Sequence, residues 1–252
     1  MRTYRVAILE CDTPLGSIVQ ERGTYGDIFT SFLRLGRETY SDHGGAAQVR
    51  LQITTCNVVN MEALPLLDAT NCILLTGSKH NAGGDDPWIL RLLEYVKSAY
   101  HTSSVRILGV CFGHQIIGRA LGGRVDRNPK GWEVSVDKVN LTPIGSKLFG
   151  VESLNLHQMH RDIVTNLPLG IESFGSSPRC ATQGFYLPKR ILSVQAHPEF
   201  DAFIMSTILN TRHEQGIFDD ALFEGAIRRA VVPHDGGLLS QIIWQFLVDE
   251  LR

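Results

Sequence analysis

The sequence shows no excess of either charge. Its 252 residues include 24 lysines and arginines against 26 aspartates and glutamates, which gives a formal net charge of -2. A chain so balanced produces no large field of one sign, and such a field is what attracts nucleic acids or anionic membranes. We therefore expect no binding to nucleic acid or membrane, and we expect partners among small molecules or other proteins.

Paired cysteine motifs and long apolar runs are also missing. The cysteines are odd in number, lie far apart and form no Cys-x-x-Cys pair, so neither a zinc site nor a redox pair is expected. They are Cys11, Cys56, Cys72, Cys111 and Cys180. No stretch approaches the ~18 apolar residues that span a bilayer, and the first residues do not resemble a secretion signal. These absences predict a reducing compartment, namely the cytoplasm with the nucleus as an additional location, and no metal or other cofactor.

Short apolar runs alternate with amphipathic segments of helix length. This alternation is typical of an α/β protein, in which helices cover both faces of a doubly wound, mostly parallel sheet. Several of the runs are nearly all apolar, as strands covered on both faces must be. The predicted strands are residues 5–9, 49–53, 72–76, 106–110 and 191–195.

Helices and a block of antiparallel strands are predicted around these parallel strands. Residues 87–100 and 112–121 have helical patterns, the second ending at a pair of glycines. Residues 132–185 alternate polar and apolar positions between turn signals, which predicts antiparallel strands inserted before the last parallel strand.

The C-terminal part of the chain has a helical pattern. It runs over residues 201–252 and is interrupted near residues 233–237. We find no repeat, linker or low-complexity tract. The predicted organisation is a single domain over residues 1–252, with a helical C-terminal extension that starts at about residue 211.

One cysteine lies between two glycines where a predicted strand runs directly into a helix. Residues 105–123 are VRILGVCFGHQIIGRALGG, and Cys111 is the centre of a Gly-x-Cys-x-Gly motif. Such a strand-to-helix turn strains its central residue and presents the side chain outward, while the glycines leave room where strand and helix crowd together. The motif predicts that Cys111 is a nucleophile. The alternative is a buried structural cysteine, which is common on an apolar strand.

The predicted helix start adds two catalytic features. A helix N-terminus and a neighbouring imidazolium both favour a thiolate over a thiol. The backbone N–H of Phe112 lies in the first helical turn, where no intrahelical partner exists, and it is therefore able to donate to an oxyanion. Phe112 is thus a predicted part of an oxyanion hole.

A second apolar strand delivers a histidine and a glutamate at its C-terminal end. Residues 191–200 are ILSVQAHPEF, and ligands of open parallel sheets bind at this edge. Pro198 disfavours a helical conformation for His197, and residues two apart in an extended chain point to the same side. We therefore predict that Glu199 orients His197 as the base for the cysteine. In the alternative, His-Pro is a simple turn and Glu199 caps the following helix.

The two segments around Cys111 and His197 resemble the two signatures of class I glutamine amidotransferases. The resemblance covers nearly the whole chain and implies a flavodoxin-like α/β fold, the class I glutaminase fold. It implies a catalytic triad of Cys111, His197 and Glu199. It also assigns Gln115, one helical turn beyond the cysteine, to substrate binding.

Two further elements resemble the same family. The stretch LLTGS occupies the place of the glycine-rich oxyanion loop and implies Gly77 as the second donor, although the usual double glycine followed by proline is absent. The stretch MHRD resembles the His-x-Asp element of the family and assigns His160 to the substrate pocket. HQMH alone would also allow a metal pair, but no further ligands stand at a matching spacing, so no metal site is predicted.

The chain resembles the stand-alone members of the class more closely than the wider class. Fungal glutamine amidotransferase-like proteins and plant γ-glutamyl peptidases share an early Cys-Asp element, here Cys11 and Asp12. They also share a Gly-Ser-x-His/Tyr type of loop followed by an Asp and Trp element, here residues 77–88. The resemblance implies hydrolysis of a γ-glutamyl amide through a γ-glutamyl thioester on the cysteine. The physiological substrate stays open between glutamine, with ammonia passed to a synthetase on a separate chain, and a glutathione-like compound.

Two other classes of function are weighed against an amidase. A redox-sensing cysteine protein of flavodoxin-like fold also places a cysteine at a strand-to-helix turn, but it does not need the His-Pro-Glu end of the other strand. A binding module without catalysis does not need an intact triad. The combination of both motifs therefore favours the cysteine amidase.

Overall fold

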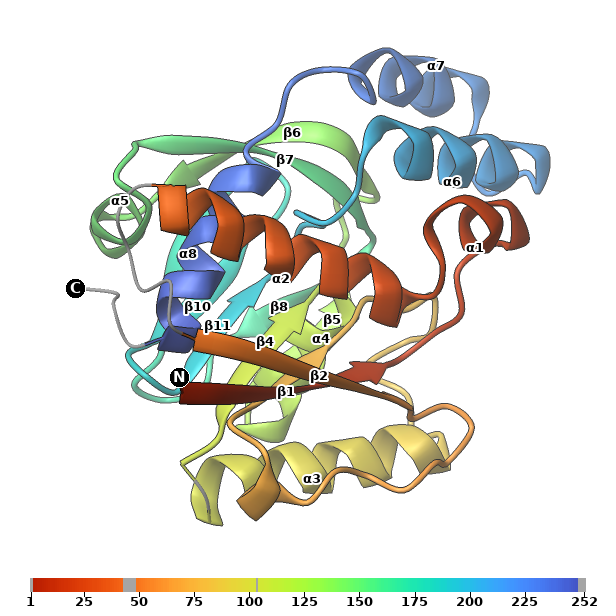
Figure 1. Cartoon of the computed structure of the whole chain (residues 1–252). Helices are drawn as coiled ribbons and strands as arrows, with labels where there is room; N and C mark the ends of the chain where they lie inside the picture. Colours follow the sequence, from red (N-terminus) through yellow and green to blue (C-terminus); the bar gives the residue numbers. More distant parts are fainter. Residues whose placement is uncertain (1, 43–48, 103, 249–252) are drawn as a thin grey trace.

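A computed structural model describes residues 2–42, 49–102 and 104–248 of the chain. Its centre is a nine-stranded sheet of order β2-β1-β3-β4-β11-β10-β9-β6-β7 (Figure 1). The first five strands in this order run parallel, and the other four are added to them in antiparallel fashion. The predicted α/β class, with a mostly parallel sheet and inserted antiparallel strands, is confirmed.

The parallel strands match the apolar runs of the sequence. They are β1 (Arg2–Glu10), β2 (Val49–Asn57), β3 (Cys72–Leu75), β4 (Arg106–Val110) and β11 (Ile191–Val194). Every residue of β3, β4 and β11 is buried, as expected for strands covered on both faces. Strand β11 pairs with β4 so that Val194 lies opposite Val110, which brings the two motif-bearing strand ends together.

The antiparallel strands all come from the segment predicted to hold them. They are β6 (Glu133–Leu141), β7 (Ser153–His160), β9 (Glu172–Ser176) and β10 (Gly184–Leu187). β8 (Asp162–Asn166), also in this segment, pairs with β5 (Arg124–Arg127), which precedes the predicted segment, in a separate two-stranded sheet. The inserted strands therefore continue the main sheet beyond β11, and β8 forms a small antiparallel pair with β5.

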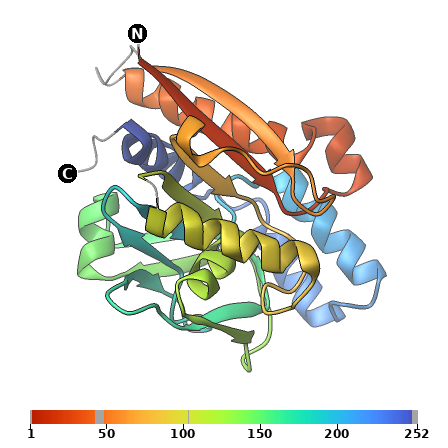
Figure 2. The ribbon, with the colours of Figure 1, turned by 90° about the horizontal axis from the view of Figure 1, so that it is seen from below.

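Helices cover both faces of the sheet. On one face α3 (Pro87–Thr102) and α4 (Phe112–Ala120) close a core that includes Leu75, and Figure 2 shows α3 in front of the strands. On the other face α2 (Tyr25–Asp42) and α8 (Gly236–Val248) close a core that includes Leu74. Neighbouring residues of one strand thus enter opposite cores, because side chains alternate along a strand.

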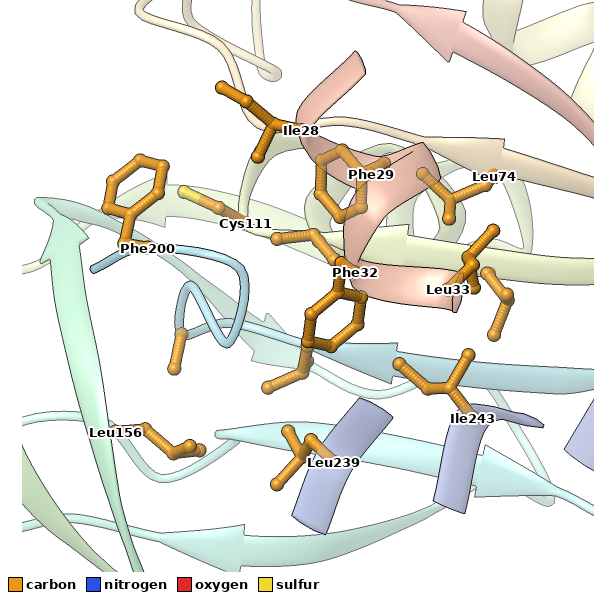
Figure 3. Close-up of a cluster of buried hydrophobic side chains, with 14 of the residues drawn as sticks. Ile28, Phe29, Phe32, Leu33, Leu74, Cys111, Leu156, Phe200, Leu239 and Ile243 are labelled. Atoms are coloured by element: carbon orange, nitrogen blue, oxygen red, sulfur yellow. The ribbon is translucent and has the colours of Figure 1, made fainter. Parts of the chain in front are cut away.

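The core beneath α2 and α8 reaches the end of β4. Figure 3 shows Phe29, Phe32 and Leu33 of α2 above Leu239 and Ile243 of α8. Cys111 and Phe200 belong to this cluster and lie at one end of it (Figure 3). Cys111, the residue after β4, therefore packs at the end of a buried apolar cluster.

Three helices gather at the C-terminal ends of the parallel strands. They are α1 (Gly16–Arg22), α6 (Ala202–Glu214) and α7 (Asp220–Arg229), which lie together in Figure 1. The remaining helices are η1 (Leu67–Ala69) and α5 (Pro143–Phe149). Within the described residues, no helix combines the length and the apolar character needed to cross a membrane.

The C-terminal helical pattern resolves into α6, α7 and α8. The break near residues 233–237 precedes most of α8, and a further break separates α6 from α7. Residue 211, where the predicted extension begins, lies inside α6, while α8 packs against α2 on the sheet. The single domain with a C-terminal extension stays a prediction.

Candidate active site

Cys111 lies in a strained turn between β4 and α4. Its φ of 51° and ψ of -103° fall where side-chain-bearing residues are rare. Its backbone N–H donates to the Val194 carbonyl over 2.9 Å, which ties the turn to β11. A Cβ on Gly113 would stand 2.8 Å from the Leu75 carbonyl carbon, so only glycine fits there. The turn is thus held by close backbone contacts that the Gly-x-Cys-x-Gly motif makes possible.

His197 and Glu199 lie side by side beyond the end of β11. The Nδ1 atom of His197 is 2.8 Å from Oε1 of Glu199. The His197 backbone N–H donates to the His157 carbonyl over 2.7 Å, and its ring stacks on Phe200 with centroids 4.1 Å apart. These contacts fix the ring with Nδ1 occupied by the carboxylate, which leaves Nε2 for another partner.

The helix-capping alternative for Glu199 does not fit the structure. The N-cap of α6 is Asp201, whose Oδ1 accepts the Ile204 backbone N–H over 2.8 Å. The Glu199 carboxylate is buried and instead faces His197. Its place is beside the imidazole rather than at the helix start.

The electrostatic environment favours a protonated His197. Burial alone lowers the pKa of the His197 imidazole, because desolvation disfavours the charged form. The negative charges of Glu199 and Cys111, together with hydrogen bonds to both side chains, outweigh burial and raise the pKa to about 10. The surroundings of the ring therefore favour the imidazolium form of His197.

Gly77 and Phe112 border the cysteine from two different elements. Gly77 follows β3, and a Cβ at this position would lie 2.6 Å from Cε1 of His197. Phe112 is the first residue of α4. Neither backbone N–H has a hydrogen-bond partner among the residues that the structure describes. Both N–H groups are therefore available to a ligand at this end of the sheet.

Gly77→Ala should lower kcat by about 10², because the new methyl group displaces the His197 ring and a displacement near 1 Å costs that much. Steady-state kinetics with folding checked by circular dichroism would measure it. Gly16→Ala is the matched control, since a Cβ there meets nothing within 4 Å. Unchanged kinetics for Gly77→Ala would show that the ring has room to move without loss.

The loop after Gly77 is tied down by the early Cys-Asp element. Thr76 Oγ1 accepts the Cys11 backbone N–H over 2.9 Å. One carboxylate oxygen of Asp12 accepts the Lys79 backbone N–H over 2.7 Å, and the other lies 3.1 Å from Lys79 Nζ. These bonds connect the ends of β1 and β3 and hold Gly77 against His197.

The predicted substrate residues come from α4 and β7. Gln115 donates from Nε2 to the Asp162 carbonyl over 2.8 Å and to Gln195 Oε1 over 3.1 Å. His160 lies with Nε2 3.0 Å from Glu133 Oε2. Both residues are buried, and both line the same cavity as Cys111. The structure therefore brings all seven predicted site residues to one end of the sheet.

Glu133 is a buried carboxylate that the sequence analysis did not select. It accepts a hydrogen bond from Gln183 Nε2 over 2.9 Å in addition to its contact with His160. Burial raises the pKa of Glu133, but the hydrogen bonds and charge of His160, with further hydrogen bonds from Ser177 and Gln183, outweigh burial and lower it. The ionised carboxylate fixes His160. A lone glutamate in a strand of buried residues was the available signal.

The cavity in front of Cys111 has a volume of about 520 Å³. This size falls in the range of about 300–1,000 Å³ that small-molecule sites occupy. Besides Cys111, Gln115, His160 and His197, its walls include residues from α1, α2, α6 and the loop after β3. All five cysteines are buried, Cys111 included, but none of the other four lines this cavity.

The two histidines of HQMH face different surroundings. The His157 ring lies 4.6 Å from the His234 ring, while His160 faces Glu133. In residues 2–42, 49–102 and 104–248, no group of three or more His, Cys, Asp or Glu side chains is arranged to hold a metal ion.

Comparisons with known proteins find relatives of this chain. A protein from Schizosaccharomyces pombe that is described as glutamine amidotransferase-like is 36% identical over 249 residues, covering 98% of this chain and 99% of that protein. Gamma-glutamyl peptidase 2 of Arabidopsis thaliana is 31% identical over 157 residues, covering 61% of this chain and 63% of its own.

A solved structure gives the same fold. The glutamine amidotransferase structure from Methylobacillus flagellatus matches with a TM-score of 0.74 at 19% identity, covering 99% of this chain and 96% of its own. The model of the family described as glutamine amidotransferase class-I matches residues 38–209. Because that match spans more than half of the sequence, the chain belongs to the class-I glutamine amidotransferase family.

Proposed function

We propose that this chain hydrolyses a γ-glutamyl amide bond, with Cys111 as nucleophile, His197 as general base and acid, and Glu199 as the residue that orients His197. The observation that carries the proposal is the buried His197 ring, whose Nδ1 lies 2.8 Å from Glu199 Oε1 and which lines the same cavity as Cys111 at its strained turn. A nucleophile, a base and an orienting carboxylate in contact are the requirements for covalent acyl transfer.

The first half of the reaction forms the thioester. The Cys111 thiolate attacks the γ-carbonyl carbon, and the carbonyl oxygen becomes an oxyanion that accepts hydrogen bonds from the Gly77 and Phe112 N–H groups. The carbon–nitrogen bond then breaks as the His197 imidazolium gives its proton to the departing nitrogen. An amine or ammonia leaves, and a γ-glutamyl thioester stays on Cys111.

The second half of the reaction consumes water. His197, now neutral, takes a proton from a water molecule that attacks the thioester carbonyl carbon. The carbon–sulfur bond breaks, glutamate leaves, and the pair of thiolate and imidazolium is restored. Overall, one water molecule supplies the hydroxyl group of the glutamate and the proton of the amine. The atoms and electrons of the reaction balance without an oxidant or a reductant.

Gln115 and His160 are the proposed contacts to the γ-glutamyl part. Both line the cavity beside Cys111; Gln115 donates to the Asp162 carbonyl, and His160 lies 3.0 Å from the buried Glu133 carboxylate. Such fixed polar groups position a substrate at little entropic cost. These contacts support a position for the γ-glutamyl group beside α4 and β7.

A γ-glutamyl peptide is the proposed substrate class, with glutamine as the second candidate. The cavity extends from Cys111 to α1 and α6, which gives space for a leaving group larger than ammonia. Similarity to a protein named gamma-glutamyl peptidase 2 favours the same choice. With glutamine, the ammonia would pass to a synthetase on a separate chain, as the wider family implies.

The ratio of kcat/KM for glutathione to that for glutamine tests this choice. We expect a ratio well above one on a single preparation at neutral pH, with release of glutamate and the free amine. A ratio well below one with brisk ammonia release would leave glutaminase activity as the function of the site.

A further inference from the structure

Arg212 occupies the wall of the cavity that α6 provides. Its guanidinium carbon lies 4.8 Å from the centre of the Trp132 ring and 5.8 Å from that of Phe218. These two rings meet edge to face with centroids 5.2 Å apart. Stacking on aromatic faces fixes the plane of a guanidinium, so its hydrogen-bonding edge is directed rather than mobile.

Arg212 has no acidic partner within the described parts of the chain. Two other cations of the cavity do: Lys79 lies 3.1 Å from Asp12, and Arg127 lies 2.6 Å from Asp162. A further cavity cation, Arg161, has an exposed side chain that water can solvate.

The Nη1 atom of Arg212 is buried and makes no hydrogen bond among the described residues. Burial lowers the pKa of the Arg212 guanidinium, although electrostatic interactions with Cys111, Tyr25 and Asp12 oppose this. Arg212 as a whole is partly buried, and a buried cationic nitrogen without a partner is stabilised when an anion pairs with it. The Nη1 atom of Arg212 is therefore available to pair with an anion in the cavity.

The anion belongs to the leaving group rather than to the γ-glutamyl part. Gln115 and His160, the proposed contacts of the γ-glutamyl part, come from α4 and β7. His197 must protonate the leaving nitrogen, so the leaving group lies on its side of Cys111. The chain that continues from His197 through Phe200 forms α6, which carries Arg212.

We propose that Arg212 binds a carboxylate of the leaving amine, and hence that the preferred substrates are γ-glutamyl amino acids or short γ-glutamyl peptides. This inference rests on the proposed γ-glutamyl hydrolase activity. A guanidinium pairs with a carboxylate through two parallel hydrogen bonds, which gives both affinity and orientation. Arg212 is a specificity residue in this account, and it takes no part in proton transfer.

A pair of substrates that differ only in this charge tests the proposal. γ-Glutamylglycine and γ-glutamylglycinamide share the scissile bond, and only the first has a carboxylate on the leaving amine. The wild-type chain should prefer the acid through a lower KM. Arg212→Met should reduce kcat/KM for the acid by about 10- to 100-fold, the range for a charged hydrogen bond, and should leave the amide nearly unchanged. Arg212→Lys should lie between them.

The control is Arg228→Met on α7, because Arg228 is 72% exposed and outside the cavity. It should not alter either substrate. An equal loss on both substrates in Arg212→Met would overturn the proposal, because Arg212 would then act on the γ-glutamyl part or on Cys111. Retained preference for the acid in Arg212→Met would overturn it as well.

Binding separates this proposal from the proposed activity. Titration calorimetry of both compounds with the Cys111→Ala chain, with and without Arg212→Met, needs no turnover. If the wild-type chain hydrolyses neither compound, the proposed activity fails. A preference for the acid that depends on Arg212 would still support the anion site, and equal affinities for the two compounds would reject it.

Discussion

Cys111→Ala should lower kcat by about 10⁶ on any substrate that the chain hydrolyses, because the loss of the nucleophile of a catalytic triad has that effect. The cavity contains no second cysteine to replace it. Substrate affinity should change little, since the γ-glutamyl contacts proposed for Gln115 and His160 stay in place. Kinetics at high enzyme concentration, with affinity from calorimetry, would measure both.

Cys56→Ala is the matched control. Cys56 is buried outside the cavity, burial raises the pKa of its thiol, and its Sγ donates to the Ala63 carbonyl over 3.3 Å. This variant should keep wild-type turnover. Should Cys111→Ala keep more than a few per cent of wild-type kcat, Cys111 is not the nucleophile.

Glu199→Gln should lower kcat by up to ~10⁴, the effect of neutralising the carboxylate of a triad. The amide lacks the charge that helps to raise the pKa of His197 to about 10, so that pKa should fall. The imidazolium proton needed by the leaving nitrogen is then lost at a lower pH. The alkaline limb of the pH profile of kcat/KM should therefore move to lower pH in this variant.

Asp201→Asn controls for a structural effect near the start of α6. Asparagine also caps helices, so α6 should persist, and Asp201 lies outside the contacts between His197 and Cys111. This variant should keep the wild-type pH profile. If Glu199→Gln shows wild-type kcat with an unshifted alkaline limb, the carboxylate does not orient His197.

The parallel strands and the turn at Cys111 could be predicted because their signals are local. Each buried strand is a short apolar run, and the sharp turn requires glycine two positions either side of the cysteine. Likewise, His197 and Glu199 meet because they are two residues apart in an extended segment after β11. Local geometry was enough in each of these places.

Other parts of the site depend on contacts between distant segments. Arg212 and Trp132 meet across 80 positions of sequence, and neither stands in a motif. Helices α1 and α2 were not predicted, although α2 covers one face of the sheet and Tyr25 at its start lines the cavity. The support of Gly77 by Asp12 likewise appears only when β1 and β3 pair. Pairing of this kind is set by the whole fold.

Isolation of the covalent intermediate tests the central claim most directly. The wild-type chain is mixed with a slowly hydrolysed γ-glutamyl substrate, quenched in acid and digested, and peptide masses locate any γ-glutamyl group. We expect the group on Cys111 alone, since burial raises the pKa values of the other four thiols and thereby weakens them as nucleophiles. Turnover without an adduct on Cys111, or an adduct on another cysteine, would contradict the thioester mechanism.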